Sequence, residues 1–396
     1  MVNIRPYTFL HYNTAKAARG ARGLADVLCP PYDVVAPDLE RRLKRNPRNF
    51  LHLELPSGTG EERYRGARDL LLRWKRQSLL VRDTAPCLYV HRCIFRDPGT
   101  GGAMLTRYGL MTLVGLDPSY RTILPHEQTK PKPVADRLRM LHALRVQTSA
   151  VFCLVEDPRR RFLARLASLC SERRPDMLAR NTDGGSDAWF RVESPETVTW
   201  LTEFLRPRKL CIADGHHRYK TACLYHQRRP ASDPDDPRNF FMAYVGSLAD
   251  PGLLILPTHR GVSDPRMGAL VDRYFVRREW DGRTPARLAL YRDGKTWTLH
   301  LRTRSLARSI PLGDIACVML DHTVLRDIPK EDIFYHQDRH RVIAWADACG
   351  GYAFLVEPVS PAAFRRVVSR GLLLPPKATY FHPKVVAGGV MFDHGE

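Results

Sequence analysis

The sequence lacks the motifs that mark several large enzyme classes. No GxxxxGK[ST] occurs, which excludes a P-loop nucleotide site. No GxGxxG follows a predicted strand, which argues against a Rossmann dinucleotide site. HExxH and GxSxG are missing as well, so neither a zinc-protease helix nor a hydrolase nucleophile turn is predicted. A phosphate or substrate site in this chain must therefore use another arrangement of residues.

Patterned cysteines and long apolar runs are also missing. The nine cysteines lie far apart and form no CxxC, which is typical of reduced thiols in a cytosolic protein. No apolar run reaches the length of a membrane span. Residues 1–20 lack the apolar core of a signal peptide. We expect a soluble, cytoplasmic protein with no membrane partner.

Positive charge is abundant but is not concentrated anywhere. Lysine and arginine number 62 against 42 acidic residues, which gives a net charge of +20 and a pI near 9.8. The longest basic run is Arg159 to Arg161, and no basic tail is present. A polyanionic partner stays open, but this spread favours arginine-rich solvated faces over a nucleic-acid site.

The pattern of predicted elements favours an α/β fold, in the sense of α+β with mixed sheets. Helical spacing of apolar residues predicts a helix over 61–80, and alternation predicts strands over 46–55, 88–95 and 342–348. The polar, Gly- and Pro-containing segment 173–188 is the best linker candidate. We therefore predict an N-terminal α/β domain over 1–190 and a C-terminal domain over 191–396.

The most informative segment is IADGHHRYKTA at 212–222, where an apolar strand end runs into a glycine and then a helix start. Gly215 allows a tight turn and close approach of a ligand. The amides after it open a helix N-terminus, which attracts anions, and Arg218 adds a bidentate fork. Asp214 is a hard-oxygen ligand for Mg²⁺ or an acceptor for a substrate hydroxyl. The alternative is a solvated corner in which Asp214 only caps the helix.

Zinc is not favoured at this segment. His216 and His217 have no partners at finger spacing, and adjacent histidines rarely bind one metal ion. We assign His216 and His217, together with Gly215 and Arg218, to the transferring phosphate. His216 and Asp214 count as catalytic residues in this hypothesis.

Three further segments are dense in reactive side chains. In LPHEQT at 124–129, Glu127 is a candidate general base, and His126 and Thr129 are candidate substrate ligands. Capping and solvated loop residues are the alternative there. Pro30 and Pro31 fix a rigid turn that aims Tyr32 and Asp33, two more candidate substrate ligands.

The third segment is KATYFHPK at 377–384, near the C-terminus. Its two lysines, Lys377 and Lys384, lie in a Pro-bounded loop with hydroxyl side chains and could close over phosphates. A solvated surface loop is the alternative. The N-terminal domain would then hold PPYDVV and LPHEQT, and the C-terminal domain would hold DGHHR and KATYFHPK.

Taken together, five segments resemble one bacterial and archaeal family, domain-of-unknown-function family 1015. They are PPYDVV at 30–35, NPRNFLHLEL at 46–55, LPHEQT at 124–129, IADGHHRYKTA at 212–222 and LPPKATYFHPK at 374–384. More distantly, DGHHR at 214–218 is similar to the turn of free-serine kinases in the ParB/sulfiredoxin-like superfamily. That resemblance implies a ParB/sulfiredoxin-like core with additional N- and C-terminal elements. It also implies phosphoryl transfer from ATP or ADP to a small hydroxyl substrate, with Mg²⁺.

We therefore interpret the chain as a small-molecule kinase that acts on a hydroxyl substrate such as free serine. Asp214 would hold Mg²⁺ or the acceptor, and Glu127, by our own inference, would take the acceptor proton. Two alternatives remain: a nucleotide-dependent ParB-like regulatory or binding protein, and a phosphatase or hydrolase that uses the same phosphate contacts. Against the first, no helix-turn-helix or basic arm is evident. The sequence does not identify the acceptor substrate, the donor nucleotide or the oligomeric state.

Overall fold

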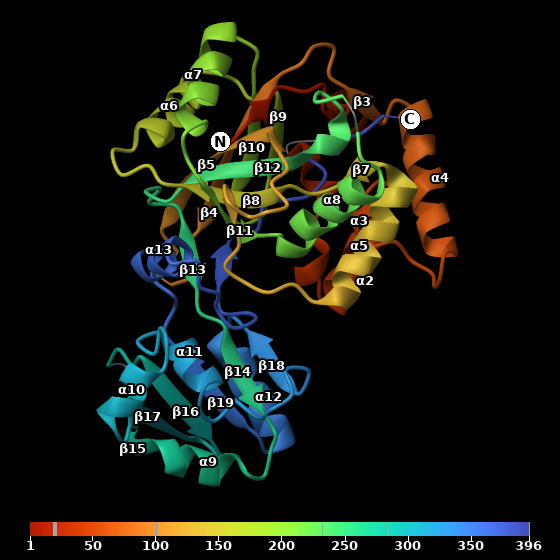
Figure 1. Ribbon diagram of the computed structural model, residues 1–396. Coiled ribbons are helices and arrows are strands. Elements are labelled where there is room, and N and C mark those ends of the chain that lie inside the picture. Colours follow the sequence, from red (N-terminus) through yellow and green to blue (C-terminus); the bar gives the residue numbers. More distant parts are fainter. Residues whose placement is uncertain (19–21, 100–101, 232, 283, 396) are drawn as a thin grey trace. The chain divides into compact units, whose positions relative to one another are not determined.

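The computed structural model describes residues 1–18, 22–99, 102–231, 233–282 and 284–395. The chain divides into two compact units, which we call unit 1 and unit 2 (Figure 1). Unit 1 consists of Met1–Pro125, Thr129–Leu253 and Pro383–Glu396, and unit 2 of His126–Gln128 and Leu254–His382. Unit 1 therefore contains both ends of the chain.

A nine-stranded mixed sheet forms the core of unit 1. Its order is β6-β11-β8-β12-β5-β4-β10-β9, and β1 pairs with β5. The strands are β1 Ile4–Arg5, β4 Leu88–Arg96, β5 Met104–Gly115, β6 Ile123–Leu124, β8 Val151–Val155, β9 Met177–Arg180, β10 Ser186–Val192, β11 Leu210–Asp214 and β12 Phe240–Ser247. The β11–β6 and β12–β8 pairs are parallel and the others are antiparallel. A four-stranded sheet joins β3 Leu80–Arg82, β2 Leu10–Tyr12, β21 Val390–Asp393 and β7 Val146–Gln147.

Helices pack beside the large sheet in two groups (Figure 1). One group is α4 Glu62–Arg76, α5 Pro131–Leu144 and α8 His216–Arg228, and the other is α6 Arg161–Cys170 and α7 Pro195–Leu205. The predicted helix over 61–80 is confirmed as α4, because Tyr64, Ala67, Leu71 and Trp74 recur at helical spacing and are buried. Shorter helices α1 Thr14–Ala17, η2 Leu24–Asp26, η3 Tyr32–Val34, α2 Pro37–Lys44 and α3 Leu51–Glu54 lie before α4, and η4 Pro237–Asn239 lies before β12.

Unit 2 is built on a six-stranded antiparallel sheet of order β15-β17-β16-β19-β14-β18. Its strands are β14 His259–Val262, β15 Phe275–Glu279, β16 Leu288–Arg292, β17 Lys295–Leu301, β18 Ile333–His336 and β19 Tyr352–Val356. Strands β13 Leu254–Leu256 and β20 Tyr380–His382 form a separate pair. The helices are α9 Met267–Tyr274, α10 Arg304–Ser309, α11 Ala316–Asp321, α12 Arg339–Cys349 and α13 Pro361–Ser369.

The predicted α/β fold with mixed sheets is confirmed, but two predicted strands are wrong. Residues 46–55 hold the short helix α3, because the Asn49 side chain accepts the Leu51 N–H and so bends the chain into a turn. Residues 342–348 belong to α12, whose N-cap Asp338 accepts the His340 N–H. In α3 the apparent alternation came from a single helical turn that buries Leu51, Leu53 and Glu54, and in α12 the buried residues Val342 and Ala346 have helical spacing.

The predicted domain boundary near residue 190 is also wrong. It falls inside β10, which pairs with β4 on one side and with β9 on the other. The polar segment 173–188 is therefore no linker: residues 181–185 are the turn of the β9–β10 hairpin. Turn residues and linker residues share the same composition, so composition alone could not separate them.

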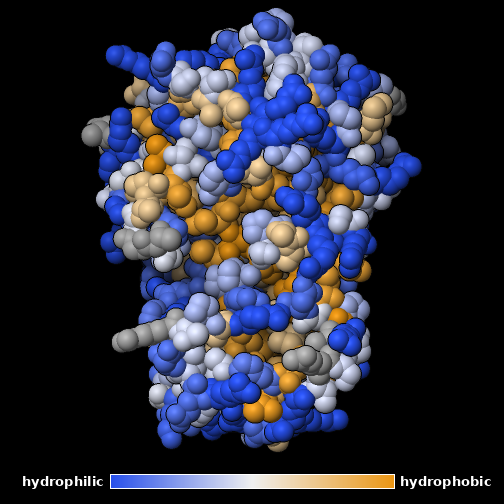
Figure 2. Space-filling view, turned by 90° about the vertical axis from the view of Figure 1, so that its left-hand side faces the viewer, coloured by the Kyte–Doolittle hydropathy of each residue, from blue (hydrophilic) through white to orange (hydrophobic). Residues whose placement is uncertain are grey.

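Two other expectations concern the whole chain. All nine cysteines are free thiols in the described structure, as their spacing predicted. Among the described residues, none of the helices is long and apolar enough to cross a membrane. Figure 2 shows hydrophilic residues spread over much of the visible surface, with hydrophobic residues exposed between them.

Candidate functional site

The predicted strand–turn–helix at 212–222 is present in unit 1. Strand β11 ends at Asp214, and the 13-residue helix α8 begins at His216. Gly215 between them has a φ of 90°, in the left-handed region that favours glycine. A Cβ at this position would lie 2.9 Å from atoms of the Arg218 guanidinium. The glycine therefore permits both the turn and the close approach of Arg218 to the backbone.

Asp214 holds two cations from distant parts of the sequence. Its Oδ2 accepts a hydrogen bond from an Arg218 guanidinium nitrogen at 2.6 Å, and its Oδ1 contacts the Lys384 ammonium group. The three side chains are only 13%, 11% and 10% exposed for Asp214, Arg218 and Lys384. Burial by itself would raise the pKa of Asp214, but the charges of Lys384 and Arg218 outweigh it and hold that pKa well below its usual range.

Arg218 is directed into unit 1 and not toward solvent. Besides Asp214 it donates to the main-chain oxygen of Ala150. Burial opposes its charged form, yet its pKa is raised, first by Asp214 and then by Asp33 and Glu54. Arg218 also lines a cavity of about 40 Å³ together with Glu54 and Ser149. The guanidinium thus lies among acidic groups from the N-terminal part of the chain.

His217 connects the starts of two helices. Its Nε2 accepts the main-chain N–H of Lys130, the residue before α5, at 3.0 Å. The imidazole of His217 therefore holds the N-terminus of α5 beside that of α8. His216 is nearly buried, and its charge is one of the influences that lower the pKa of Asp214.

Glu54 was not singled out by the sequence analysis. It is buried, and its Oε1 accepts hydrogen bonds from the Ser149 hydroxyl at 3.0 Å and the Tyr32 N–H at 3.4 Å. Its Oε2 has no hydrogen-bond partner within the described structure. The Arg137 guanidinium stacks over the Tyr32 ring at 4.2 Å from the centroid. The only sequence signal for Glu54 was its position in NPRNFLHLEL, a segment that we interpreted as a strand.

PPYDVV approaches the junction as a short helical turn. Tyr32 and Asp33 belong to η3, and the negative charge of Asp33 helps to raise the pKa of Arg218. Burial raises the pKa of Tyr32 far above its usual range, so this phenol stays protonated at physiological pH. Tyr32 and Asp33 therefore lie near Arg218, and their role as substrate ligands stays a prediction.

The segment LPHEQT divides between the two units. His126 and Glu127 belong to unit 2, where His126 Nε2 lies 2.9 Å from the Thr379 hydroxyl and packs on Phe364. His126 is buried in this packing. Thr129 belongs to unit 1 and lines a cavity of about 470 Å³ beside α5 and α8. Glu127 as general base stays a prediction.

KATYFHPK divides in the same way. Lys384 belongs to unit 1 and contacts Asp214, so this lysine reaches the predicted motif. Lys377 belongs to unit 2 and has a φ of 58°. The two lysines, which we predicted as one phosphate-binding loop, are therefore held by different parts of the fold.

Magnesium was predicted at Asp214. Each oxygen of this carboxylate already contacts a cation, and these two positive charges would repel a metal ion at the same site. No group of three or more histidine, cysteine, aspartate or glutamate side chains could hold a metal ion in the searched, described part of the chain. Asp214 does not fit a metal ligand in this arrangement, and its observed role is to hold Arg218 and Lys384.

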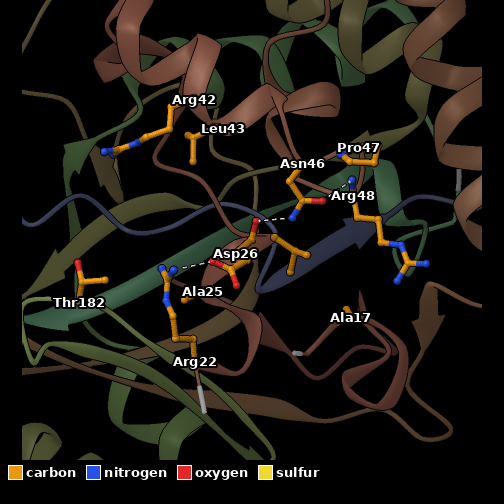
Figure 3. A pocket seen from close by; sticks show the side chains of 11 residues that line it. Ala17, Arg22, Ala25, Asp26, Arg42, Leu43, Asn46, Pro47, Arg48 and Thr182 are labelled. Carbon is orange, nitrogen blue, oxygen red and sulfur yellow. Dashed lines mark hydrogen bonds and ion pairs between the residues drawn. The ribbon is translucent and has the colours of Figure 1, made fainter. Parts of the chain in front are cut away.

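Another cavity lies elsewhere in unit 1 (Figure 3). It measures about 600 Å³ and contains no residue of the β11–α8 junction. Its lining residues are Ala17, Arg22, Ala25, Asp26, Val27, Arg42, Leu43, Asn46, Pro47, Arg48 and Thr182. None of them was a predicted site residue.

The fold and this junction define the class: a mixed α/β protein with a strand–glycine–helix junction that holds two cations on one carboxylate. The chain belongs to the family described as protein of unknown function (DUF1015), whose model matches residues 4–323. Residues 374–384, which we included in the resemblance, lie beyond that match. No curated protein matches the chain.

Several solved structures are similar to the chain at low identity. A variant of a free serine kinase in complex with ADP is 13% identical, with 68% of this chain and 87% of that chain covered and a TM-score of 0.39. A conserved hypothetical protein from Pyrococcus furiosus is 14% identical, with 69% and 92% covered and a TM-score of 0.36. SbnI from Staphylococcus aureus, truncated at its C-terminus, is 10% identical, with 69% and 84% covered and a TM-score of 0.34. At these values we draw nothing about function from the likeness.

Proposed function

We propose that the chain is a cytoplasmic small-molecule kinase that transfers a phosphoryl group from ATP or ADP to a hydroxyl substrate such as free serine. The observation that supports this most is the pair of shielded cations, Arg218 and Lys384, on one carboxylate at the start of α8. Phosphoryl transfer needs charge neutralisation and positioning more than covalent help from the protein. Two fixed cations beside a helix N-terminus meet that need.

The donor phosphates would bind where α5 and α8 begin. His217 holds these two N-termini together through the Lys130 N–H. Helix α8 has 13 residues, and its start has a set of unpaired N–H groups and an aligned macrodipole. Helix α5 has 14 residues and also an aligned macrodipole, but Pro131 and Pro133 in its first turn have no N–H, so Lys132 is the donor there. Asp214 would keep Arg218 and Lys384 in place, and Gly215 would let the phosphate approach the backbone.

The body of the nucleotide would occupy the cavity of about 470 Å³ beside these helices. Its walls include the apolar side chains of Val134, Leu138 and Leu224, and its polar residues include Thr129 and Lys220. A volume of several hundred cubic ångströms suits a small-molecule ligand. Lys220 lies one helical turn beyond His216, which is the correct spacing to extend the same face of α8.

The acceptor would lie toward Tyr32, Asp33 and Glu54. We keep Glu127 as the general base and His126 and Lys377 as ligands of the substrate and phosphate, as predicted from the sequence. Mg²⁺ would supply further neutralisation of phosphate charge when bound, but no step is assigned to it here because the oxygens of Asp214 are occupied by cations. A ParB/sulfiredoxin-like core is the fold that the sequence motif implies for this arrangement.

The proposal predicts nucleotide binding that depends on Arg218. Arg218→Ala should weaken ATP or ADP binding by about tenfold to a hundredfold, because a charged bidentate donor contributes about 1.5–3 kcal/mol. Arg218→Lys keeps the charge but loses the bidentate guanidinium, so its nucleotide affinity should lie between those of the wild type and Arg218→Ala. Arg159→Ala is the matched control, since Arg159 is exposed and outside the junction. Isothermal titration calorimetry measures all four proteins.

The outcomes separate the possible functions. A wild type with no nucleotide affinity, or equal losses for Arg159→Ala and Arg218→Ala, would refute the proposal. With binding established, transfer to a panel of amino acids and polyols is measured by ³¹P NMR, and Glu127→Gln should lower turnover without lowering nucleotide affinity. Release of phosphate to water in place of transfer would identify a phosphatase. Binding with neither reaction would identify a nucleotide-dependent regulatory protein.

A further inference from the structure

The cavity of about 600 Å³ in Figure 3 is lined by arginines from three separate segments. Arg22 precedes η2, Arg42 is part of α2, and Arg48 lies between α2 and α3. Figure 3 shows Arg42 at the upper left, Arg48 at the right and Arg22 at the lower left, where it points toward Asp26. Three guanidinium groups therefore surround a single hollow.

Negative charge in the cavity does not balance these arginines. Asp26 is the only acidic residue among the described residues that line the cavity, and it pairs with Arg22 at 2.8 Å. The Arg48 guanidinium donates to the main-chain oxygen of Lys16 at 3.1 Å, which leaves its charge unmatched. The main-chain oxygen of Arg42 accepts the Arg45 N–H, but its guanidinium has no ion pair or hydrogen bond to another described residue. Among the described lining residues, three positive charges and one negative charge leave an excess of two positive charges.

Two side-chain amides hold the walls of the cavity in place. Asn46 and Asn49 both donate to the main-chain oxygen of Asp26, at 2.9 and 3.0 Å, and Asn49 donates also to Leu28. Asn46 accepts the Arg48 N–H at 3.0 Å. Asn49 is completely buried. These bonds join the wall that holds Asp26 to the wall that holds Arg48, so little ordering is needed when a ligand binds.

We propose that this cavity binds a phosphate ester of a small organic molecule. Guanidinium groups form bidentate, charge-assisted hydrogen bonds with phosphate oxygens. The apolar side chains of Ala25, Val27 and Leu43 would contact the organic part. The volume lies within the range of small-molecule sites. This site shares no residue with the β11–α8 junction and does not rest on the proposed function.

The probe for this site is phenyl phosphate, titrated calorimetrically into the full chain. Arg42→Ala and Arg48→Ala should each weaken binding by about tenfold or more, since each removes a charged donor. Arg41→Ala is the control, because Arg41 is on the same helix, pairs with Asp38 and does not line the cavity. It should change affinity less than about twofold, by the small effect of an exposed ion pair. Inorganic phosphate should bind more weakly than phenyl phosphate, because it lacks the apolar part.

Each result of these titrations either supports or overturns the proposed phosphate-ester site. Binding that Arg42→Ala and Arg48→Ala weaken, and that Arg41→Ala and Arg218→Ala do not, supports the site. No binding by the wild type, or equal losses for Arg41→Ala and Arg42→Ala, overturns it in favour of solvated arginines on a surface of net charge +20. A loss only in Arg218→Ala also overturns it, because the probe then occupies the junction. Arg42 is exposed, so its removal should leave the unfolding midpoint unchanged.

Discussion

At the scale of single residues, Asp214 decides the character of the junction. Its carboxylate is shielded from solvent and has a cation on each oxygen. A buried ion pair gains little over apolar packing, but the loss of one partner leaves an uncompensated charge. The three charges therefore depend on one another, and they bring the C-terminal segment to the start of α8.

Removal of Lys384 should expose this dependence. We expect Lys384→Met to lower the free energy of unfolding by about 3 kcal/mol, because Asp214 then keeps only one cation in a buried site. The double variant Asp214→Asn with Lys384→Met should lose less than the sum of the two single variants. Urea unfolding followed by circular dichroism provides the measurement. Arg41→Met, which breaks an exposed pair, should cost at most about 1 kcal/mol; strict additivity at Asp214 would contradict the coupling.

At the scale of secondary-structure elements, the junction of β11 and α8 determines where Asp214 and Arg218 lie. The strand is buried within the sheet between β6 and β8, and the helix begins directly after one glycine. A short connection of this kind directs the first amides of α8 past the end of the strand. The left-handed glycine is needed for two reasons, its backbone conformation and its contact with Arg218.

A pair of glycine variants separates those two reasons. Gly215 and Gly184 have φ values of 90° and 87°, but a Cβ at Gly184 would meet nothing within 4 Å. Gly184→Ala should lower the free energy of unfolding by about 1 kcal/mol from backbone strain alone. Gly215→Ala should cost more, about 2–3 kcal/mol, because the methyl group displaces Arg218. It should also weaken nucleotide binding. The free energies of unfolding are measured by thermal and urea unfolding. If Gly184→Ala and Gly215→Ala lower them equally, Arg218 adjusts to the added methyl group without cost.

For the whole molecule, each unit contains a histidine that is kept neutral by its surroundings. Burial, with the charge of Arg260, lowers the pKa of His259 in unit 2 to about 4. Burial likewise lowers the pKa of His394 in unit 1 to about 4. The Nδ1 of His259 accepts the Val356 N–H at 3.1 Å, which requires the unprotonated nitrogen. Both units should therefore respond to acid in the same pH range.

Stability should fall as the pH falls from about 6.5 to about 4. A histidine with a depressed folded pKa contributes its full stability above the unfolded value of about 6.5 and loses it as the pH drops toward the folded value. For His259 the loss is about 3 kcal/mol. Urea unfolding at several pH values measures it, and His259→Gln should reduce the slope. His52→Gln is the control; an unchanged slope in His259→Gln would contradict the assignment.

The sequence by itself determined the features that depend on neighbouring residues. Helical spacing predicted α4, and the glycine in DGHHR predicted the strand–turn–helix junction, because both follow from local geometry. Similar local signals gave wrong predictions at 46–55 and 173–188. The first segment contains a helix although its apolar pattern is typical of a strand, and the second is part of a hairpin although its composition is typical of a linker. Tertiary structure alone decided that Lys384 meets Asp214 across 170 residues, that Glu54 lies beside Arg218, and that LPHEQT and KATYFHPK divide between two units. Which charges meet depends on how the sheet brings distant segments together, and no local pattern in the chain encodes that distance.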